Sequence, residues 1–261
     1  MTPSPGWAPG SLAPRPGAAP RLAMLAAQTR VELLLLLRNG EQVLLSLVVP
    51  VSLLLVLSLL DFVEIDRTDV SRVDFFTPGV LALAVLSTAF TGQAIATGFE
   101  RQYGVLKRLG ATALPRPTLL LAKTLSVLAV ELLQMLLVGG VAYALGWDPA
   151  GNVLSVLALV ILGTAAFSGL GLLLGGTLRG LTCLAVANLR WLLLLVLGGI
   201  LFGLDAFGPA EPLLRLLPSA ALSDGLRATL VDGRLVGQDL VTLAVWAAGS
   251  LLAASRAFRW E

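Results

Sequence analysis

Long runs of apolar residues dominate the chain, and short polar segments separate them. A helix needs about 20 mostly apolar residues to cross the hydrocarbon core of a bilayer. The pattern therefore predicts six membrane-spanning helices, the first of them kinked at Pro50 because proline cannot donate within a helix. We place these spans at residues 43–60, 78–99, 118–145, 153–178, 181–204 and 240–257.

Two segments precede the first span. Residues 1–20 are rich in Pro, Gly and Ala, which is typical of a disordered tail. In residues 21–38, charged positions interrupt apolar ones at helical spacing, which favours an amphipathic helix on the membrane surface. The alternative is a solvent-exposed helical segment that simply leads into the first span. We expect residues 21–261 to form one transmembrane domain.

Composition supports this assignment. The chain is 57% hydrophobic and 13% charged, whereas soluble domains carry about 25% charged residues. It has no His and one Cys, which excludes most zinc sites, haem ligation, His-based catalysis and intrachain disulfides. We predict an all-α integral membrane protein with no catalytic or metal-binding residue and no nucleic-acid partner.

Lys and Arg residues are unevenly distributed between the two sides of the predicted bundle. They are concentrated in the N-terminal segment, in the loop after the second span, and at the C-terminal end. The intervening loops are acidic or uncharged by comparison. Because cytoplasmic loops carry the excess of positive charge, we expect both termini to face the cytoplasm.

The segment before the last span, residues 205–239, is too long for a tight turn and too apolar for a free loop. We predict a re-entrant segment of short helices that dip into the outer leaflet. Pro218 marks a break, and Ser219 is a possible N-cap. Such a segment serves either as an outer gate or as a plug that only packs.

The loop after the second span reads FERQYGVLKRLGATALPRPTLLLAK. Phe99, Tyr103 and Leu106 recur at helical spacing, while Gly110 and the prolines after it stop the helix. The pattern predicts a short amphipathic helix beginning near Phe99 and parallel to the membrane. An aromatic anchor with flanking charges suits a groove on another protein. The alternative is that the helix only rests on lipid headgroups.

This loop resembles the cytoplasmic loop of ABC-2 type permeases, and is most similar to the drug-exporter, daunorubicin-resistance-like membrane subunits. The segments GLLLGGTLRG, ANLRWLLLL and LPSAALSDGLRATL extend the resemblance over most of the chain. The resemblance implies a coupling helix that seats in a separate ATP-binding subunit, with residues 21–38 as a connecting helix beside it. The coupling candidates are Glu100, Arg101, Tyr103, Gly104, Leu106, Lys107 and Arg108.

The resemblance also implies a function. The chain would be the permease subunit of an ABC exporter in the plasma membrane, moving a hydrophobic or amphipathic drug, lipid or secondary metabolite out of the cell. It would act as a homodimer with two ATP-binding subunits, which hold the ATP and Mg²⁺. The chain itself has no GxxxxGK[ST] phosphate loop. The alternative is a stand-alone secondary transporter.

Four polar residues lie within predicted spans, where ionisable groups are costly and face protein, water or substrate. They are Glu131, Gln134, Asn188 and Arg190. Glu131 and Arg190 have similar predicted depths, which suggests either an ion pair, within one subunit or across a dimer, or a lining role in the transport path. Small residues spaced four apart, at 165/169, 171/175 and 199/203, predict close approach of the fourth and fifth spans.

Overall fold

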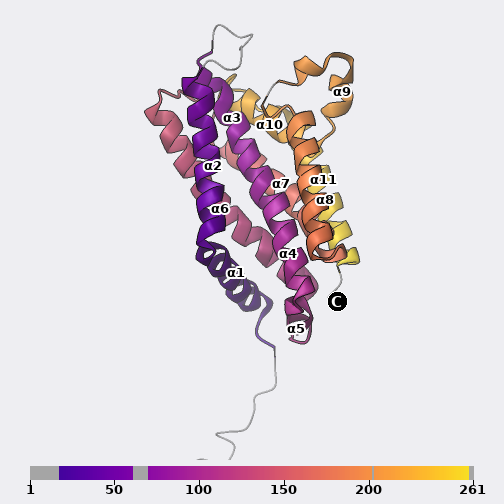
Figure 1. Ribbon diagram of the computed structural model, residues 1–261. Helices are drawn as coiled ribbons and strands as arrows, with labels where there is room; N and C mark the ends of the chain where they lie inside the picture. Colours follow the sequence, from indigo (N-terminus) through magenta and orange to yellow (C-terminus); the bar gives the residue numbers. More distant parts are fainter. Residues whose placement is uncertain (1–17, 61–69, 202, 259–261) are drawn as a thin grey trace, which may run out of the picture.

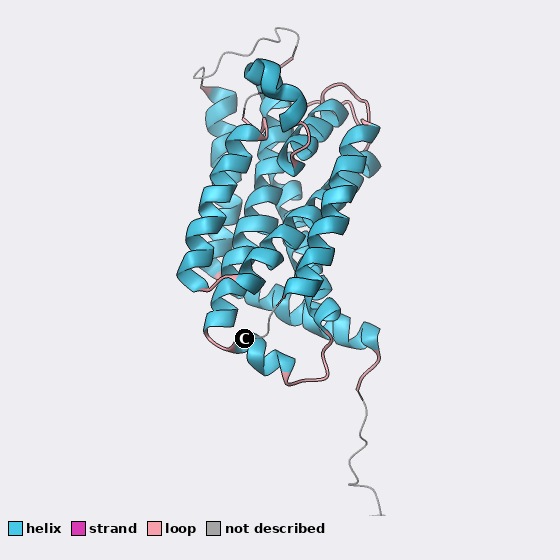
Figure 2. Cartoon of the chain, turned by 90° about the vertical axis from the view of Figure 1, so that its right-hand side faces the viewer, coloured by secondary structure: helices cyan, strands magenta, loops and turns pink. Residues whose placement is uncertain are grey.

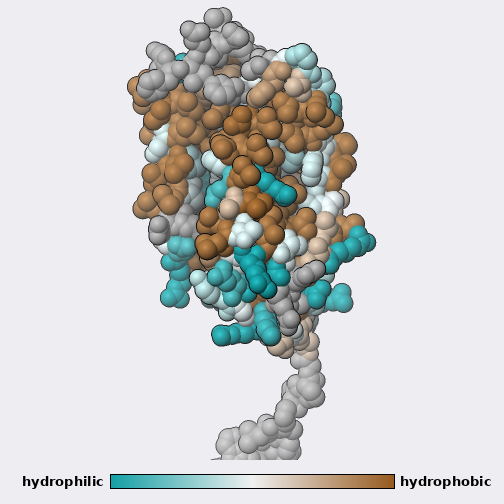
Figure 3. All heavy atoms as spheres, turned by 45° about the vertical axis from the view of Figure 1, so that its right-hand side comes forward, coloured by the Kyte–Doolittle hydropathy of each residue, from teal (hydrophilic) through white to brown (hydrophobic). Residues whose placement is uncertain are grey.

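The computed structural model describes residues 18–60, 70–201 and 203–258, and within these ranges every regular element is a helix (Figures 1 and 2). Most of the predicted tail, residues 1–17, lies outside the described residues. The helices form an elongated bundle, and hydrophobic residues cover most of the face shown in Figure 3. The all-α membrane fold predicted from the sequence is confirmed.

Five helical segments are long and apolar enough to cross a membrane, and a bent helix pair supplies a sixth candidate. The pair is α1 (Arg21–Arg38) and α2 (Gly40–Leu59). The other spans are the continuous α3–η1–α4 segment (Arg72–Gln102), α6 (Arg116–Ala144), α7 (Val153–Thr177), α8 (Gly180–Leu197) and α11 (Gly237–Ala257). Each predicted span has its helix, although the second begins earlier and the fifth ends earlier than predicted.

Helix α1 does not continue straight into α2. The two axes meet at 67°, so α1 lies across one end of the bundle while α2 runs along it (Figure 1). The last described residues, after α11, lie at this same end. This geometry fits the predicted interfacial helix and an even number of spans.

The second span is the most enclosed. Its three parts are α3 (Arg72–Val85), the π-helical η1 (Leu86–Gly92) and α4 (Gln93–Gln102). Of its most apolar window, 78% is buried, against 22% for α8 and α11. The second span therefore forms the inner wall of the bundle, whereas α8 and α11 form outer faces. The π-helical turn within this span is a further feature of interest, because such a turn inside an α-helix often marks a functional position.

Glycines on α7 allow this close packing. A Cβ at Gly171 would lie 2.7 Å from the main-chain oxygen of Phe90, and one at Gly175 would lie 2.7 Å from that of Ala94. The predicted approach of the fourth and fifth spans is therefore wrong, because these glycines contact the second span. Gly169 faces α11 at Ser250, and Gly199 lies beyond the end of α8 with a φ of 61°.

The loop after the second span contains a break that the sequence interpretation missed. Helix α4 ends at Gln102, Gly104 has a φ of 72°, and a separate helix α5 (Val105–Gly110) follows. Only glycine adopts such a φ at little cost. Phe99 therefore belongs to the end of the second span, and the short helix begins at Val105.

The segment before α11 folds into η2 (Leu204–Ala210), α9 (Glu211–Leu214) and α10 (Pro218–Leu230) at the end opposite α5 (Figure 1). Helix α10 is almost entirely buried and packs against α3, α7 and α11. Pro218 occupies its first turn and Leu217 is its N-cap, so the prediction of Ser219 as cap is wrong. The hydroxyl of Ser223 donates to the main-chain oxygen of Gly198, 2.7 Å away, and so fastens α10 to the end of α8.

Candidate functional site

Helix α5 projects from the bundle at the α1 end. Tyr103, directly before it, is 69% exposed and its ring stacks on that of Phe99, with 6.0 Å between centroids. Lys107 and Arg108 are exposed as well. Together with Gly104, which sets the turn, these residues form a cationic surface with an aromatic centre, which we call the α5 surface.

One residue of α5 points the other way. Leu106 is fully buried and belongs to a cluster that joins the ends of three spans on the α5 side of the bundle. Its neighbours are Leu119, Leu120, Leu172, Ala254 and Phe258. Leu106 is therefore an anchor that ties α5 to α6, α7 and the end of α11, and it is not available to a partner.

Glu100 also points inward, so the prediction that it contacts a partner is not supported by its position. Lys123 on α6 donates to Glu100 Oε1 at 2.8 Å and to Glu32 Oε2 on α1 at 2.9 Å. We call these three residues the ionic triad. It joins α1, α4 and α6 at the base of the second span. Arg101, beside Glu100, is half-buried.

Sequence reasoning missed two members of the triad, although each carried a signal. Glu32 is the one carboxylate within α1, and Lys123 is a charged residue inside a long apolar helix. Ionisable residues in such positions pair with each other or mark functional paths.

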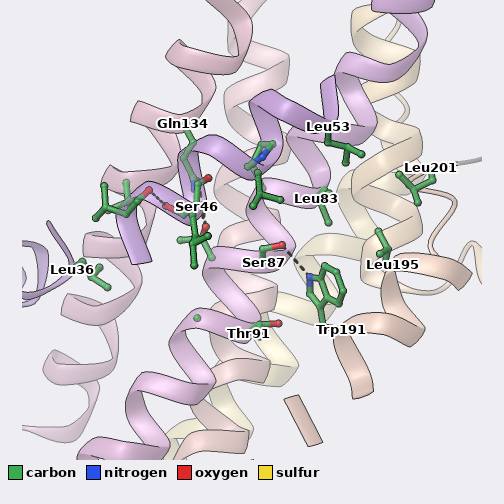
Figure 4. A pocket seen from close by; sticks show the side chains of 18 residues that line it. Leu36, Ser46, Leu53, Leu83, Ser87, Thr91, Gln134, Trp191, Leu195 and Leu201 are labelled. Carbon is green, nitrogen blue, oxygen red and sulfur yellow. Dashed lines mark hydrogen bonds between the residues drawn. The ribbon is translucent and has the colours of Figure 1, made fainter. Parts of the chain in front are cut away.

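A cavity of about 480 Å³ lies between α2, α3, η1, α6 and α8 (Figure 4). Its walls are mostly aliphatic, and the few polar side chains come chiefly from η1. Ser87, Thr88 and Thr91 all line it from that π-helical segment. Trp191 on α8 closes one side by donating from Nε1 to the Ser87 hydroxyl at 3.0 Å.

Gln134 is part of the cavity wall, and its amide joins three elements. Its Nε2 donates to the main-chain oxygen of Ser46 on α2 at 2.9 Å and to the Thr88 hydroxyl on η1 at 3.1 Å. Of the four polar residues predicted to lie within spans, Gln134 is the one that lines this cavity.

Glu131 lies elsewhere. It is fully buried and accepts a hydrogen bond from the Thr164 hydroxyl on α7. Arg190 and Asn188 are on the exposed face of α8, where Asn188 Nδ2 donates to the main-chain oxygen of Leu184 at 3.0 Å. Glu131 and Arg190 therefore do not pair within the subunit. Similar depth did not bring them together because the two side chains point in different directions around their helix axes.

A multi-pass helical bundle, a helix across one end of it, a projecting cationic helix and an apolar cavity are features of a membrane transport protein. The sequence profile of the ABC-2 type transporter family matches residues 25–231. The chain belongs to that family and is a permease component of an ABC transporter. No curated protein sequence matches it. Permeases of this family are not themselves catalytic and work with an ATP-binding subunit.

Proposed function

We propose that the chain is the permease subunit of an ATP-driven exporter that moves a hydrophobic or amphipathic drug, lipid or secondary metabolite out of the cell across the plasma membrane. The observation that carries the proposal is the α5 surface. It projects from the bundle at the end where α1 lies and where the described chain ends (Figure 1). The positive charge of this end supports a cytoplasmic location, where an ATP-binding subunit can reach it.

The contacts of α5 provide a route for force into the bundle. Leu106 ties α5 to α6 and α7, and α4 continues through η1 into the wall of the cavity. A displacement of α5 by the partner therefore shifts the second span, which carries Ser87 and Thr88. ATP binding changes the conformational equilibrium because the partner contacts the two states differently.

The outer face of α8 supports a homodimer. Arg190 and Asn188 are exposed within an apolar helix, and a lipid-facing Arg at the centre of a span costs about 2.5–3.5 kcal/mol. A second copy of the chain that packs against this face removes the contact with lipid. Such a dimer binds two ATP-binding subunits, which hold the ATP and Mg²⁺.

One observation favours the alternative of a stand-alone secondary transporter. Glu131 is a buried carboxyl group with one oxygen that has no hydrogen-bond partner among the described residues, and transporters use such groups to carry ions. The two functions differ in their energy source. Export from sealed vesicles that needs ATP and the partner supports our proposal, and export driven by an ion gradient alone supports the alternative.

The α5 surface is tested with the two tyrosines of the chain. Tyr103 is 69% exposed at the α5 end, and Tyr143 is 75% exposed in the last turn of α6 at the other end. Loss of a central interface aromatic costs about 2 kcal/mol or more. We therefore expect Tyr103→Ala to weaken co-purification with the ATP-binding subunit of the transporter, and to lower substrate-stimulated ATP hydrolysis.

The matched control is Tyr143→Ala, which should bind the partner and stimulate hydrolysis as the wild type does. Both variants are first checked for insertion and monodispersity. Wild-type association and hydrolysis in Tyr103→Ala would contradict the proposed coupling surface.

A further inference from the structure

A small pocket of about 140 Å³, with the ionic triad in its wall, adjoins the apolar cavity on the side of α1. The two spaces share Leu36, Thr88 and Gly92 in their walls. We propose that this pocket, called the annex here, binds the cationic head of an amphiphilic amine whose apolar body lies in the cavity. This inference rests on the proposed export function and names its substrate class.

The ionic triad gives the annex an excess of negative charge. Among the described residues that line it, the ionisable ones are Glu32, Glu100 and Lys123, which amount to two carboxylates and one ammonium group. One ammonium group shared by two buried carboxylates leaves a formal charge of −1, and a second cation placed beside them is favourable because it balances that charge. The annex is therefore suited to a positively charged group.

Of the two carboxylates, Glu100 is the more accessible to a ligand. Glu32 has both oxygens engaged, since Gln28 Nε2 donates to Oε1 at 2.8 Å and Lys123 donates to Oε2 at 2.9 Å. Lys123 Nζ lies 2.8 Å from both carboxylate oxygens of Glu100, and no other donor among the described residues reaches this carboxylate. The Glu100 side chain is 22% exposed, against 9% for Glu32. An incoming ammonium group therefore meets Glu100 first.

Two further side chains in the annex are buried with an unused polar atom. Neither Thr97 Oγ1 nor Gln93 Nε2 has a hydrogen-bond partner within the described part of the chain, and both residues are buried. Thr97 lies one turn before Glu100 on the same face of α4, so its hydroxyl oxygen is placed to accept from the same ammonium group. Gln93 Oε1 accepts from the Ser168 hydroxyl at 2.7 Å, which leaves Nε2 to donate to an acceptor atom next to the amine.

The sizes of the cavity and the annex suit different parts of such a ligand. The cavity, at about 480 Å³, falls within the roughly 300–1,000 Å³ typical of small-molecule sites, and its aliphatic and Trp191 walls suit an apolar body. The annex, at about 140 Å³, holds a head group and not a body. Arg190 lines neither space, so its positive charge does not oppose the amine there.

The test uses a matched pair of probes and the purified full-length chain in lipid nanodiscs. One probe is a fluorescent aryl-alkyl amine, and the other is its N-acetyl derivative, which has the same body and no charge. Binding is followed by fluorescence anisotropy. We expect the amine to bind about tenfold more tightly than the amide, a difference of about 1.4 kcal/mol.

Three variants locate this preference. Glu100→Gln should abolish the preference for the amine while the neutral probe binds as before, which also shows that the variant is folded. Thr97→Val leaves the ionic triad intact and should weaken amine binding about threefold, the loss expected for one hydrogen bond. Glu211→Gln removes a carboxylate from α9 at the opposite end and should change nothing.

Several results would overturn the inference. Equal binding of amine and amide to the wild type and to Glu100→Gln would remove the cation site while leaving an apolar export cavity in place. Displacement of the amine by millimolar NaCl or KCl, but not by choline chloride at the same ionic strength, would assign the annex to an inorganic cation. Failure of both probes to bind the wild type or to stimulate hydrolysis by the complex would overturn the proposed substrate class as well.

Discussion

The side-chain amide of Gln134 on α6 donates to the main-chain oxygen of Ser46 on α2, at 2.9 Å. In an unbroken helix that oxygen would accept from the N–H four residues later, but this position is Pro50, which has none. The interhelical bond therefore replaces the one that proline removes. In hydrocarbon an unsatisfied main-chain group costs several kcal/mol, so the polar residue in α6 allows the proline in α2 to be accommodated.

We expect Gln134→Leu to lower the free energy of unfolding by about 1–3 kcal/mol, because it leaves the Ser46 oxygen without a donor. Pro50→Ala restores a main-chain N–H to α2 and should recover part of the loss in the double variant. Thermal unfolding of the four forms in the same detergent gives the double-mutant cycle. Simple additivity of the two effects would show that the proline and the glutamine are not coupled.

The ionic triad should be essential to stability. Lys123→Met leaves two carboxylates, Glu32 and Glu100, facing each other without their cation. Removal of one partner from a buried ion pair costs about 3–5 kcal/mol, and we expect a loss of this order in the free energy of unfolding. Adding Glu32→Gln and Glu100→Gln to this variant should return most of it.

Lys107→Met is the control for the loss of one lysine, because Lys107 is exposed on α5. Its effect should stay within about 0.5 kcal/mol, as for most surface substitutions. Equal stability of the two lysine variants would mean that the triad does not hold α1 against the bundle.

The contact of α7 with the second span predicts a strict size limit at Gly175. A Cβ there would lie 2.7 Å both from the main-chain oxygen of Ala94 and from the Cβ of Thr97. We expect Gly175→Ala to cost about 1–3 kcal/mol, as overpacking of a close contact does. Gly249 on α11 has nothing within 4 Å of the same added atom, so Gly249→Ala should be neutral or stabilising. Melting temperatures measured side by side test the difference.

The main features of the fold could be predicted because hydrophobicity alone determines them. A run of about 20 apolar residues has few alternatives to a membrane span, so the five or six candidate spans and the buried helical segment before α11 were identified. Boundaries were less certain. Gly104 was counted with the coupling residues but not recognised as the break between α4 and α5, since a glycine in a helical pattern shows its φ only in the structure.

The site was harder to predict because it depends on rotation about helix axes. Gln134 was singled out from the sequence and lines the cavity, but its partner, Ser46, contributes a main-chain atom that the sequence does not show. Glu100 was predicted to contact a partner protein, but its carboxylate points into the bundle and accepts a hydrogen bond from Lys123. The position of a residue along a span determines the depth of its side chain. The direction in which that side chain points depends on how the neighbouring helices pack around the span.

Glu131 and Arg190 test this distinction between depth and direction directly. Glu131 accepts from the Thr164 hydroxyl inside the subunit and is fully buried, while Arg190 is exposed on α8. We therefore expect Thr164→Val to lower the free energy of unfolding by about 1–3 kcal/mol, the usual cost of leaving a buried acceptor without its donor. Arg190→Leu should not rescue Glu131→Gln, and the effects of these two substitutions should add. Unfolding of the single and double variants in nanodiscs measures both results, and a marked rescue would mean that the two residues meet in a state other than the one described.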